Sequence, residues 1–483
     1  MVPHRSPTLD ARRLAAAGLL GLLAACNALT GIGDLAATAC DTCDGGVGAG
    51  GGVDGGSDAV VGPIDGAPLD GPAGDTRIEG PGGTLDMTFG LGGIVESDLL
   101  ADPRAVAVRA DGRILVAGAF SNVLASVAFT STGAVDTTFG SSGRVIHGQG
   151  NSSVGSAVAF DTAGRALVGG LSTTVSMMGL TARYPYVVRI GAAQVDATFG
   201  DNGSWRGQRS GQEVRGLVTT PSGGVALSVA DNDEHAFWLL TSAGGPDMAF
   251  GDEGMASVSF GGEPAGLVAR ADGFVSGGSG RTLANERAYG AAKISLGGTP
   301  VITFGIVGKA AAKVGTKSDA IGRAIGAQPD GKLVLVGDHS PNLSSTATRR
   351  VSSALRFTAA GQLDLAYGTA GNVVIDLTET IVGRDTETQA VGVPLDAKGR
   401  ALVVGTVTDK PAGGGDRSRA WVVRLRADGS FDPLFGAQGQ LLFGARLEAR
   451  GAALQPDGKL IVVGVNRDGG RLFVARVITT TTL

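Results

Sequence analysis

Aromatic residues, histidine and cysteine are all scarce in this sequence. Only 5% of its 483 residues are aromatic, and it holds four His and three Cys. His147, His235 and His339 are far apart in the sequence and lack the spacing of metal ligands. Neither a G-x-S-x-G motif nor a Walker A motif is present. We therefore predict no catalytic residue, no bound metal and no cofactor.

The charge balance is close to neutral and the glycine content is high. The 40 Lys and Arg residues face 45 Asp and Glu, which leaves a net charge of -5. Without a basic excess, nucleic acid is not an expected partner. Glycine, with 82 residues, favours many short strands joined by tight turns. The composition therefore indicates an all-β protein.

The N-terminal segment has the successive parts of an export signal. Arg5, Arg12 and Arg13 form a positive region, and residues 14–25 form an apolar stretch too short to span a bilayer as a helix. The stretch runs into Leu-Ala-Ala-Cys, ending at Cys26, which resembles the lipobox of bacterial lipoproteins. We predict a lipoprotein signal peptide over residues 1–25. An ordinary secretory signal followed by a chance cysteine is the alternative.

The lipobox resemblance implies a modification and a location. In such lipoproteins the cysteine thiol receives diacylglycerol and the chain is cut just before it, so Cys26 would become a lipidated membrane anchor. Asn27 and Ala28 follow, so the family's inner-membrane retention signal, an Asp after the cysteine, is missing. The resemblance therefore implies an exported protein anchored in the outer membrane or at the cell surface, with the membrane as a partner.

A tether is predicted between the anchor and the body of the protein. Residues 26–84 are rich in Gly, Asp and Pro and show no apolar period, which is typical of a disordered linker. Cys40 and Cys43 form a lone C-x-x-C in this tether, without a second pair to complete a zinc site. We interpret them as a possible small local disulfide in an oxidising compartment.

Two motifs alternate seven times through the rest of the chain. The second contains an Asp-Gly turn in its clearest copies, such as RADGRILVAG from Arg109 and QPDGKLIVVG from Gln455. We call the first the FG motif, after its aromatic-glycine pair. Its copies are LDMTFGLGGIV from Leu85, VDTTFGSSGRV from Val135, VDATFGDNGSW from Val195, PDMAFGDEGMA from Pro246, PVITFGIVGKA from Pro300, LDLAYGTAGNV from Leu363 and FDPLFGAQGQL from Phe431.

This alternation resembles the delta-60 repeat, an uncharacterised β-propeller repeat of bacterial surface and secreted proteins. The resemblance covers roughly residues 85 to 477 and departs most at Val301, where the other copies have Asp, and at Tyr367, where they have Phe. It implies a propeller fold and brings no known activity, cofactor or catalytic residue. The three Trp in the chain argue against WD40 repeats and quinoprotein propellers.

The residues themselves predict the same architecture. Each copy holds four short apolar runs bounded by turn residues, hence four antiparallel strands, which we name A to D from the axis outwards. We expect strand A to be innermost because one of its columns holds only Ala or Gly. Its members are Ala105, Ala157, Gly216, Gly266, Ala324, Gly392 and Gly451. The fold predicted for residues 85–483 is a seven-bladed propeller, whose last blade is closed by the N-terminal strand at Ile94.

Loops alternate between the two faces of such a propeller. The Asp-Gly and FG turns share one face, which we call the FG face, and the irregular B–C and D–A loops share the other, the variable face. Strand A opens on the variable face with a column of acids, and arginines follow two positions later. The residues are Asp102, Glu213, Glu263 and Glu448, with Arg104, Arg215, Arg323 and Arg450. These charges could form salt bridges between blades or an anion or glycan site at the channel mouth.

Two classes of function fit this sequence. The first is a surface-anchored binding or scaffold propeller with a protein or glycan ligand on the variable face, where loop variation usually carries function. The second is a propeller hydrolase or lyase with a metal held at the channel mouth by the acids. The poor catalytic signals favour the first, although they do not decide whether the protein is an enzyme.

Overall fold

The computed structural model describes residues 79–317, 319–341, 349–377, 385–410 and 417–482, and every regular element in these ranges is a strand. Within these ranges no helix is long and apolar enough to cross a membrane. The predictions for Cys26, Cys40 and Cys43 fall outside the described residues.

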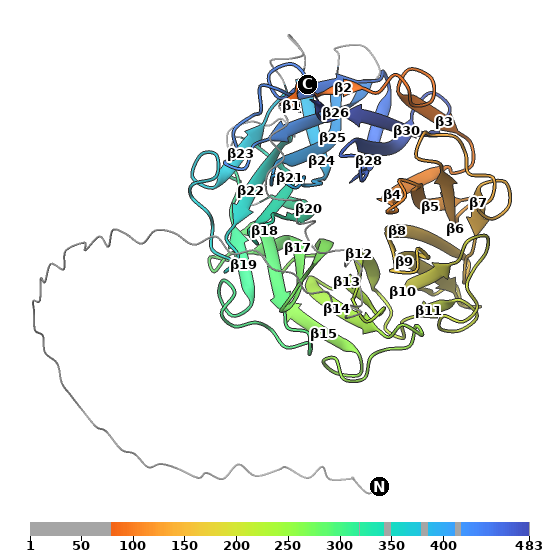
Figure 1. The fold of residues 1–483 in the computed structure, drawn as a ribbon. Helices are drawn as coiled ribbons and strands as arrows, with labels where there is room; N and C mark the ends of the chain where they lie inside the picture. The colour runs from red at the N-terminus through yellow and green to blue at the C-terminus, as the bar shows by residue number, and fades with distance from the viewer. Residues whose placement is uncertain (1–78, 318, 342–348, 378–384, 411–416, 483) are drawn as a thin grey trace, which may run out of the picture. The chain divides into compact units, whose positions relative to one another are not determined.

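Four-stranded antiparallel sheets follow one another along the chain and form a ring, as Figure 1 shows. The first six blades are β4 (Asp102–Val108), β5 (Ile114–Phe120), β6 (Val123–Phe129), β7 (Arg144–Ile146); β8 (Ser152–Phe160), β9 (Ala166–Val175), β10 (Thr181–Ile190), β11 (Ser204–Arg206); β12 (Glu213–Thr219), β13 (Val225–Asp231), β14 (Glu234–Leu240), β15 (Met255–Ser259); β16 (Pro264–Arg270), β17 (Gly273–Arg281), β18 (Arg287–Ile294), β19 (Lys309–Ala312); β20 (Ile321–Ala327), β21 (Leu333–His339), β22 (Val351–Phe357), β23 (Asn372–Ile375); and β24 (Asp385–Gly392), β25 (Ala401–Lys410), β26 (Arg417–Leu425), β27 (Gln440–Phe443).

The seventh blade joins the two ends of the repeat region. It contains β28 (Leu447–Leu454), β29 (Leu460–Asn466) and β30 (Arg471–Ile478), and its outer strand is β3 (Ile94–Ser97) from the start of the repeats. In this register Ile94 faces Ala475 and Ser97 faces Leu472. The predicted seven-bladed propeller with a closing N-terminal strand is therefore confirmed.

Short strands before β3 also pair with the end of the chain. β2 (Thr84–Leu85) pairs with β30, and β1 (Glu79–Gly80) pairs with β31 (Thr481–Thr482). Residues 79–84, which the sequence places at the end of the tether, thus pair with the C-terminal segment, and Thr84 extends the sheet of the last blade. The FG motif of Leu85 follows directly.

The first strand of every blade lies nearest the axis and contacts the first strand of the next blade, including β28 with β4. Close approach between these strands explains their Ala and Gly column. A Cβ atom built on Gly216 would lie 2.6 Å from the backbone nitrogen of Leu267 in the next blade. A larger side chain there would push two blades apart.

The hydrophobic core lies between neighbouring blades. One cluster joins blades seven and one, with Phe89, Ile461 and Val463 packed against Ile114 and Val116. The ring of Phe89 is fully buried, and a Cβ atom added at Gly133 in blade one would lie 2.8 Å from it. The aromatic residues of the FG motifs are therefore wedges between blades, as their size suggests.

The Asp of the FG motif caps its own turn and also forms buried ion pairs. Asp86 accepts a hydrogen bond from the backbone nitrogen of Thr88 at 3.1 Å, the turn geometry that the sequence indicates. In four blades, an arginine of strand C also binds the carboxylate of the FG-motif Asp, at N–O distances of 2.9 to 3.0 Å. The pairs are Arg189–Asp196, Arg356–Asp364, Arg424–Asp432 and Arg476–Asp86.

Candidate functional site

The predicted arginine column lies on a β-bulge that recurs in the innermost strand. In every blade the register between strands A and B shifts at one residue, which has no single partner opposite it. A bulge turns its side chain away from the regular alternation of the strand. The sequence analysis treated strand A as a regular strand and did not predict the bulge. The bulged residues are Arg104, Ser156, Arg215, Ala265, Arg323, Val391 and Arg450.

In blades one and seven the predicted acids and arginines pair within a single strand. Arg104 Nε lies 2.9 Å from Asp102 Oδ2, and Arg450 Nη2 lies 2.9 Å from Glu448 Oε1. Arg467, from the B–C loop of the same blade, also binds Glu448. These charges therefore neutralise one another locally.

Between blades three and four, an arginine of the predicted column binds acids of both blades. Arg215 Nη1 lies 3.3 Å from Glu213 Oε1, and its Nη2 lies 3.6 Å from Glu263 Oε2 in the next blade. The two acids lie at the starts of neighbouring innermost strands. The structure thus brings three of the eight predicted residues into one small cluster.

Arg323 has a partner that the sequence did not indicate. Its Nε lies 2.8 Å from Oδ1 of Asp338, a buried residue on β21, and Arg350 Nε lies 2.5 Å from the other oxygen of that carboxylate. Because Asp338 comes from strand B, no pattern in strand A could reveal this pair. Each of the eight predicted residues therefore takes part in an ion pair.

The ionisable side chains do not converge as metal ligands do. In the part of the chain that the structure describes, no group of three or more His, Cys, Asp or Glu side chains is placed to hold a metal ion. The acid column at the channel mouth binds arginine instead. We derive no metal-dependent step from it.

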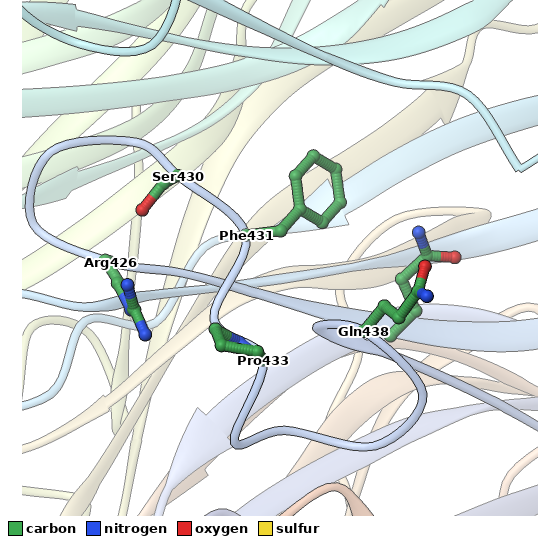
Figure 2. A pocket seen from close by; sticks show the side chains of 6 residues that line it. Arg426, Ser430, Phe431, Pro433 and Gln438 are labelled. Carbon is green, nitrogen blue, oxygen red and sulfur yellow. The ribbon is translucent and has the colours of Figure 1, made fainter.

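A shallow depression of about 480 Å³ lies on the FG face, in blade six (Figure 2). Residues in and beside the FG turn line it. Its one charged lining residue is Arg426, whose Nε lies 3.6 Å from Asp432 Oδ1. The depression is therefore separate from the charged columns of the variable face. Its lining is Arg426, Ser430, Phe431, Pro433, Gln438 and Gln440.

The variable face carries an extended hairpin in blade two. Strands β9 and β10 are each ten residues long and meet in a turn closed by the hydrogen bond from Ser176 N to Leu180 O at 2.9 Å. At its tip the Met178 side chain is 88% exposed, and Met177 and Leu180 are also exposed. This segment is a B–C loop, which the sequence analysis assigned to the variable face without a further prediction. Its consecutive methionines were the signal for an apolar tip.

Part of the first repeat is similar to a β-propeller family without a known role. Residues 109–139, which run from the first Asp-Gly motif to Phe139 of the next FG motif, match the family model described as a domain of unknown function (DUF5122) beta-propeller. No curated protein matches this chain. The family match thus covers part of one repeat and brings no activity.

Several solved structures resemble the chain at low sequence identity. They include the polysaccharide lyase Uly1, at 11% identity over 84% of this chain and 98% of that one, with a TM-score of 0.37. A glucose dehydrogenase is similar at 10% identity, over 80% of this chain and 98% of that one, with a TM-score of 0.36. A protein of unknown function from Dyadobacter fermentans is similar at 11% identity over 84% and 99%, with a TM-score of 0.36. At these scores none of them supports an argument about function.

Proposed function

We propose that this protein is a lipid-anchored propeller whose variable face binds a partner protein. The lipobox at Cys26 supports the anchor, and residues 27–78 supply a linker between the anchor and the propeller. At ~5–6 Å times the square root of the residue number, a coil of this length reaches ~40 Å. Such a linker lets an anchored propeller meet a partner near the membrane surface.

The observation that carries this proposal is the apolar hairpin tip of blade two. Met177, Met178 and Leu180 project beyond the sheet, where their exposure to water is unfavourable. Methionine side chains are flexible and polarizable, so they adapt to the surface of a partner. A protein partner offers the apolar contacts that such a tip requires, and it is therefore favoured over a glycan.

The charged columns supply the polar part of the same face. Ion pairs at an interface rim contribute more to specificity and association rate than to affinity. Arg215, held between Glu213 and Glu263, presents a fixed charge pattern of this kind. Because the arginines already have acidic partners, a free anion or glycan would have to compete with carboxylates. The charged columns therefore support protein recognition.

Site-specific photocrosslinking in the producing cells tests the partner. A photoreactive residue replacing Met178 should give a discrete protein adduct, whereas one replacing Thr137 on the FG face should not. Met177→Ser with Leu180→Ser should reduce the Met178 adduct strongly while the thermal unfolding midpoint stays unchanged. Adducts only from Thr137, or a Met178 adduct that is insensitive to these replacements, would contradict the proposal.

The anchor has its own test. Cys26→Ala should leave the protein unlipidated and move it from the membrane fraction to the soluble fraction. A single acyl chain gives only marginal membrane binding, with an association constant on the order of 10⁴ M⁻¹, so stable anchoring needs the several chains of a lipoprotein. Equal membrane binding of Cys26→Ala and the unchanged protein would contradict the anchor.

A further inference from the structure

Exposed apolar side chains gather on the FG face of blades three to seven. They belong to the FG motifs and the turns beside them, and each has at least half of its side chain exposed. We call this set the apolar arc. Its members are Met87, Leu91, Met248, Leu296, Ile302, Ile306, Val307, Leu365 and Leu434.

Blades one and two lack this apolar surface. At the positions of Leu91 and Ile306, counted from the aromatic residue of each motif, blades one and two carry Ser141 and Asp201, and blade three carries Asp252. The FG turn therefore folds equally well with polar residues at these positions. The apolar residues of the arc are not required by the turn itself.

Val307 has a backbone conformation that is unfavourable for its side chain. It has φ = 52° and a side chain that is 61% exposed. The equivalent residues Asn202 and Glu253 adopt φ near 50° as well, but a β-branched side chain is strained in this left-handed region. Val307 is thus unfavourable both for its backbone and for its exposure to water. Strain of this kind is concentrated at sites that do something other than stabilise the fold.

The chain enters the propeller beside the apolar arc. Gly82 donates its backbone N–H to Leu434 O at 2.8 Å and accepts a hydrogen bond from Gly436 N at 2.9 Å. The segment that leads back to Cys26 therefore joins the body at the FG motif of blade six. This motif holds Leu434, an arc residue.

We propose that the apolar arc docks on the surface of a phospholipid bilayer. This inference builds on the anchor proposed above, because a lipid at Cys26 would hold the FG face near the membrane. The arc consists of one to four side chains from each of five blades, spread over separate turns of one face. Such a spread of short projections suits insertion between lipid headgroups better than one continuous protein surface. Docking in this way directs the variable face and its hairpin away from the membrane, toward a partner.

The charges around the arc are paired, so docking on a bilayer should not require charged lipids. In the Asp-Gly turns of the same face, Lys332 Nζ lies 3.2 Å from Asp330 Oδ2 and Lys459 Nζ lies 3.3 Å from Asp457 Oδ2. This face therefore presents charges of both signs in close pairs. Binding through the arc should occur on zwitterionic lipid and depend little on salt.

The experiment uses the full chain with Cys26→Ala, Cys40→Ser and Cys43→Ser, which removes the anchor and the native thiols. One cysteine is then introduced at Leu365 in the arc, at Ser141 on the FG face outside it, or at Met178 on the variable face. Each is labelled with an environment-sensitive dye and titrated with phosphatidylcholine vesicles carrying a brominated quencher lipid. We expect a blue shift and quenching at Leu365, a weaker response at Ser141 and none at Met178.

Replacing Ile306→Ser and Val307→Asn in the Leu365-labelled protein should weaken the lipid response. Asparagine tolerates the left-handed conformation, so this variant should unfold at the same or a higher temperature, and lost binding would not reflect lost folding. The absence of a lipid response at Leu365, or an equal response at Met178, would overturn the proposal. So would a Leu365 signal that follows protein concentration without lipid, because a second copy would then cover the arc. Since no anchor is present, a failure here leaves the Cys26 test unaffected.

Discussion

Arg476 Nη2 lies 3.0 Å from Asp86 Oδ2, and this buried pair connects the last blade strand in the chain to the first FG motif. The guanidinium also lies 4.7 Å from the centre of the Phe89 ring and donates from Nη1 to Ser131 O in blade one at 2.6 Å. Burial opposes ionisation of Asp86, but hydrogen bonds from Thr88 and the charges of Lys459 and Arg476 outweigh it and lower the pKa of Asp86 to about 2. One arginine therefore joins two blades at the point where the ring closes.

Arg476→Met should destabilise the propeller by about 2–3 kcal/mol, because buried Asp86 would lose its charged hydrogen-bond partner in strand C and keep only Lys459 as a charged partner, 3.1 Å from its Oδ2. Chemical denaturation followed by circular dichroism measures this change. Arg471→Met is the control. Arg471 lies on the same strand as Arg476 but pairs with Asp98 at the protein surface, so its replacement should lower the free energy of unfolding by at most about 1 kcal/mol. Equal effects of the two replacements would show that the Arg476–Asp86 pair does not stabilise ring closure.

Deleting residues 85–100 should lower the unfolding midpoint of the entire propeller. The deletion removes β3, so β30 would lose its outer neighbour and expose an unpaired edge. Leu91→Ser in the same segment changes only an exposed side chain and should leave the midpoint unchanged. A deletion variant that unfolds at the original midpoint would contradict the role of the N-terminal strand.

Phe139→Ala should cost about 3–5 kcal/mol because its buried ring fills space between blades one and two. Thr137→Ala, two residues earlier in the same motif and exposed, should change stability by less than about 0.5 kcal/mol. Thermal or denaturant unfolding distinguishes these values. Similar small losses from both would mean that the FG aromatic residue does not act as a wedge.

Gly216→Ala and Gly392→Ala compare two positions of one column. The added methyl group would clash at Gly216, with atoms 2.6 Å away, whereas at Gly392 its nearest neighbour is 3.7 Å away. Overpacking should cost about 1–3 kcal/mol at Gly216, and the change at Gly392 should be close to neutral. The free energies of unfolding of both variants check this expectation. A neutral Gly216→Ala would mean that the innermost strands can move apart.

His235 should make stability depend on pH in the acidic range. Burial lowers the pKa of His235 to about 4, and its ring binds Ser276 Oγ at 2.7 Å and Ser279 O at 2.8 Å. The unfolded chain takes up a proton below about pH 6.5 but the folded chain does not, so this contribution is complete above pH 6.5 and is lost as the pH falls toward 4.

The loss attributable to His235 should reach about 3 kcal/mol at pH 4, from 1.36 kcal/mol per unit of pKa difference. It is measured as the difference between the pH profiles of the original protein and His235→Gln, because both retain the other titrating groups. Parallel profiles between pH 7 and pH 4 would contradict this assignment.

Repetition in the sequence was enough to predict the blade number, the strand order and the closing strand. Each of these depends on signals that are local within one repeat, such as the Asp-Gly turn at Gly112 or the aromatic residue at Phe139. An FG motif and strand D precede the first strand A, so the sequence order alone requires Ile94 to complete the last blade. The buried FG aromatic residues follow from the same pattern.

The partners of individual side chains were decided only by the tertiary structure. A bulge at Arg215 and a strand B carboxylate beside Arg323 leave no trace in the column that contains both arginines. The apolar arc was also decided by the tertiary structure, because the sequence assigns Met87 and Leu365 to FG turns of one face but does not show that their side chains remain exposed. Periodicity in a sequence determines which strands form and how they repeat. The tertiary structure determines which side chains meet, whether within one blade as for Arg323 and Asp338 or between blades as for Arg215 and Glu263, because no local pattern records either contact.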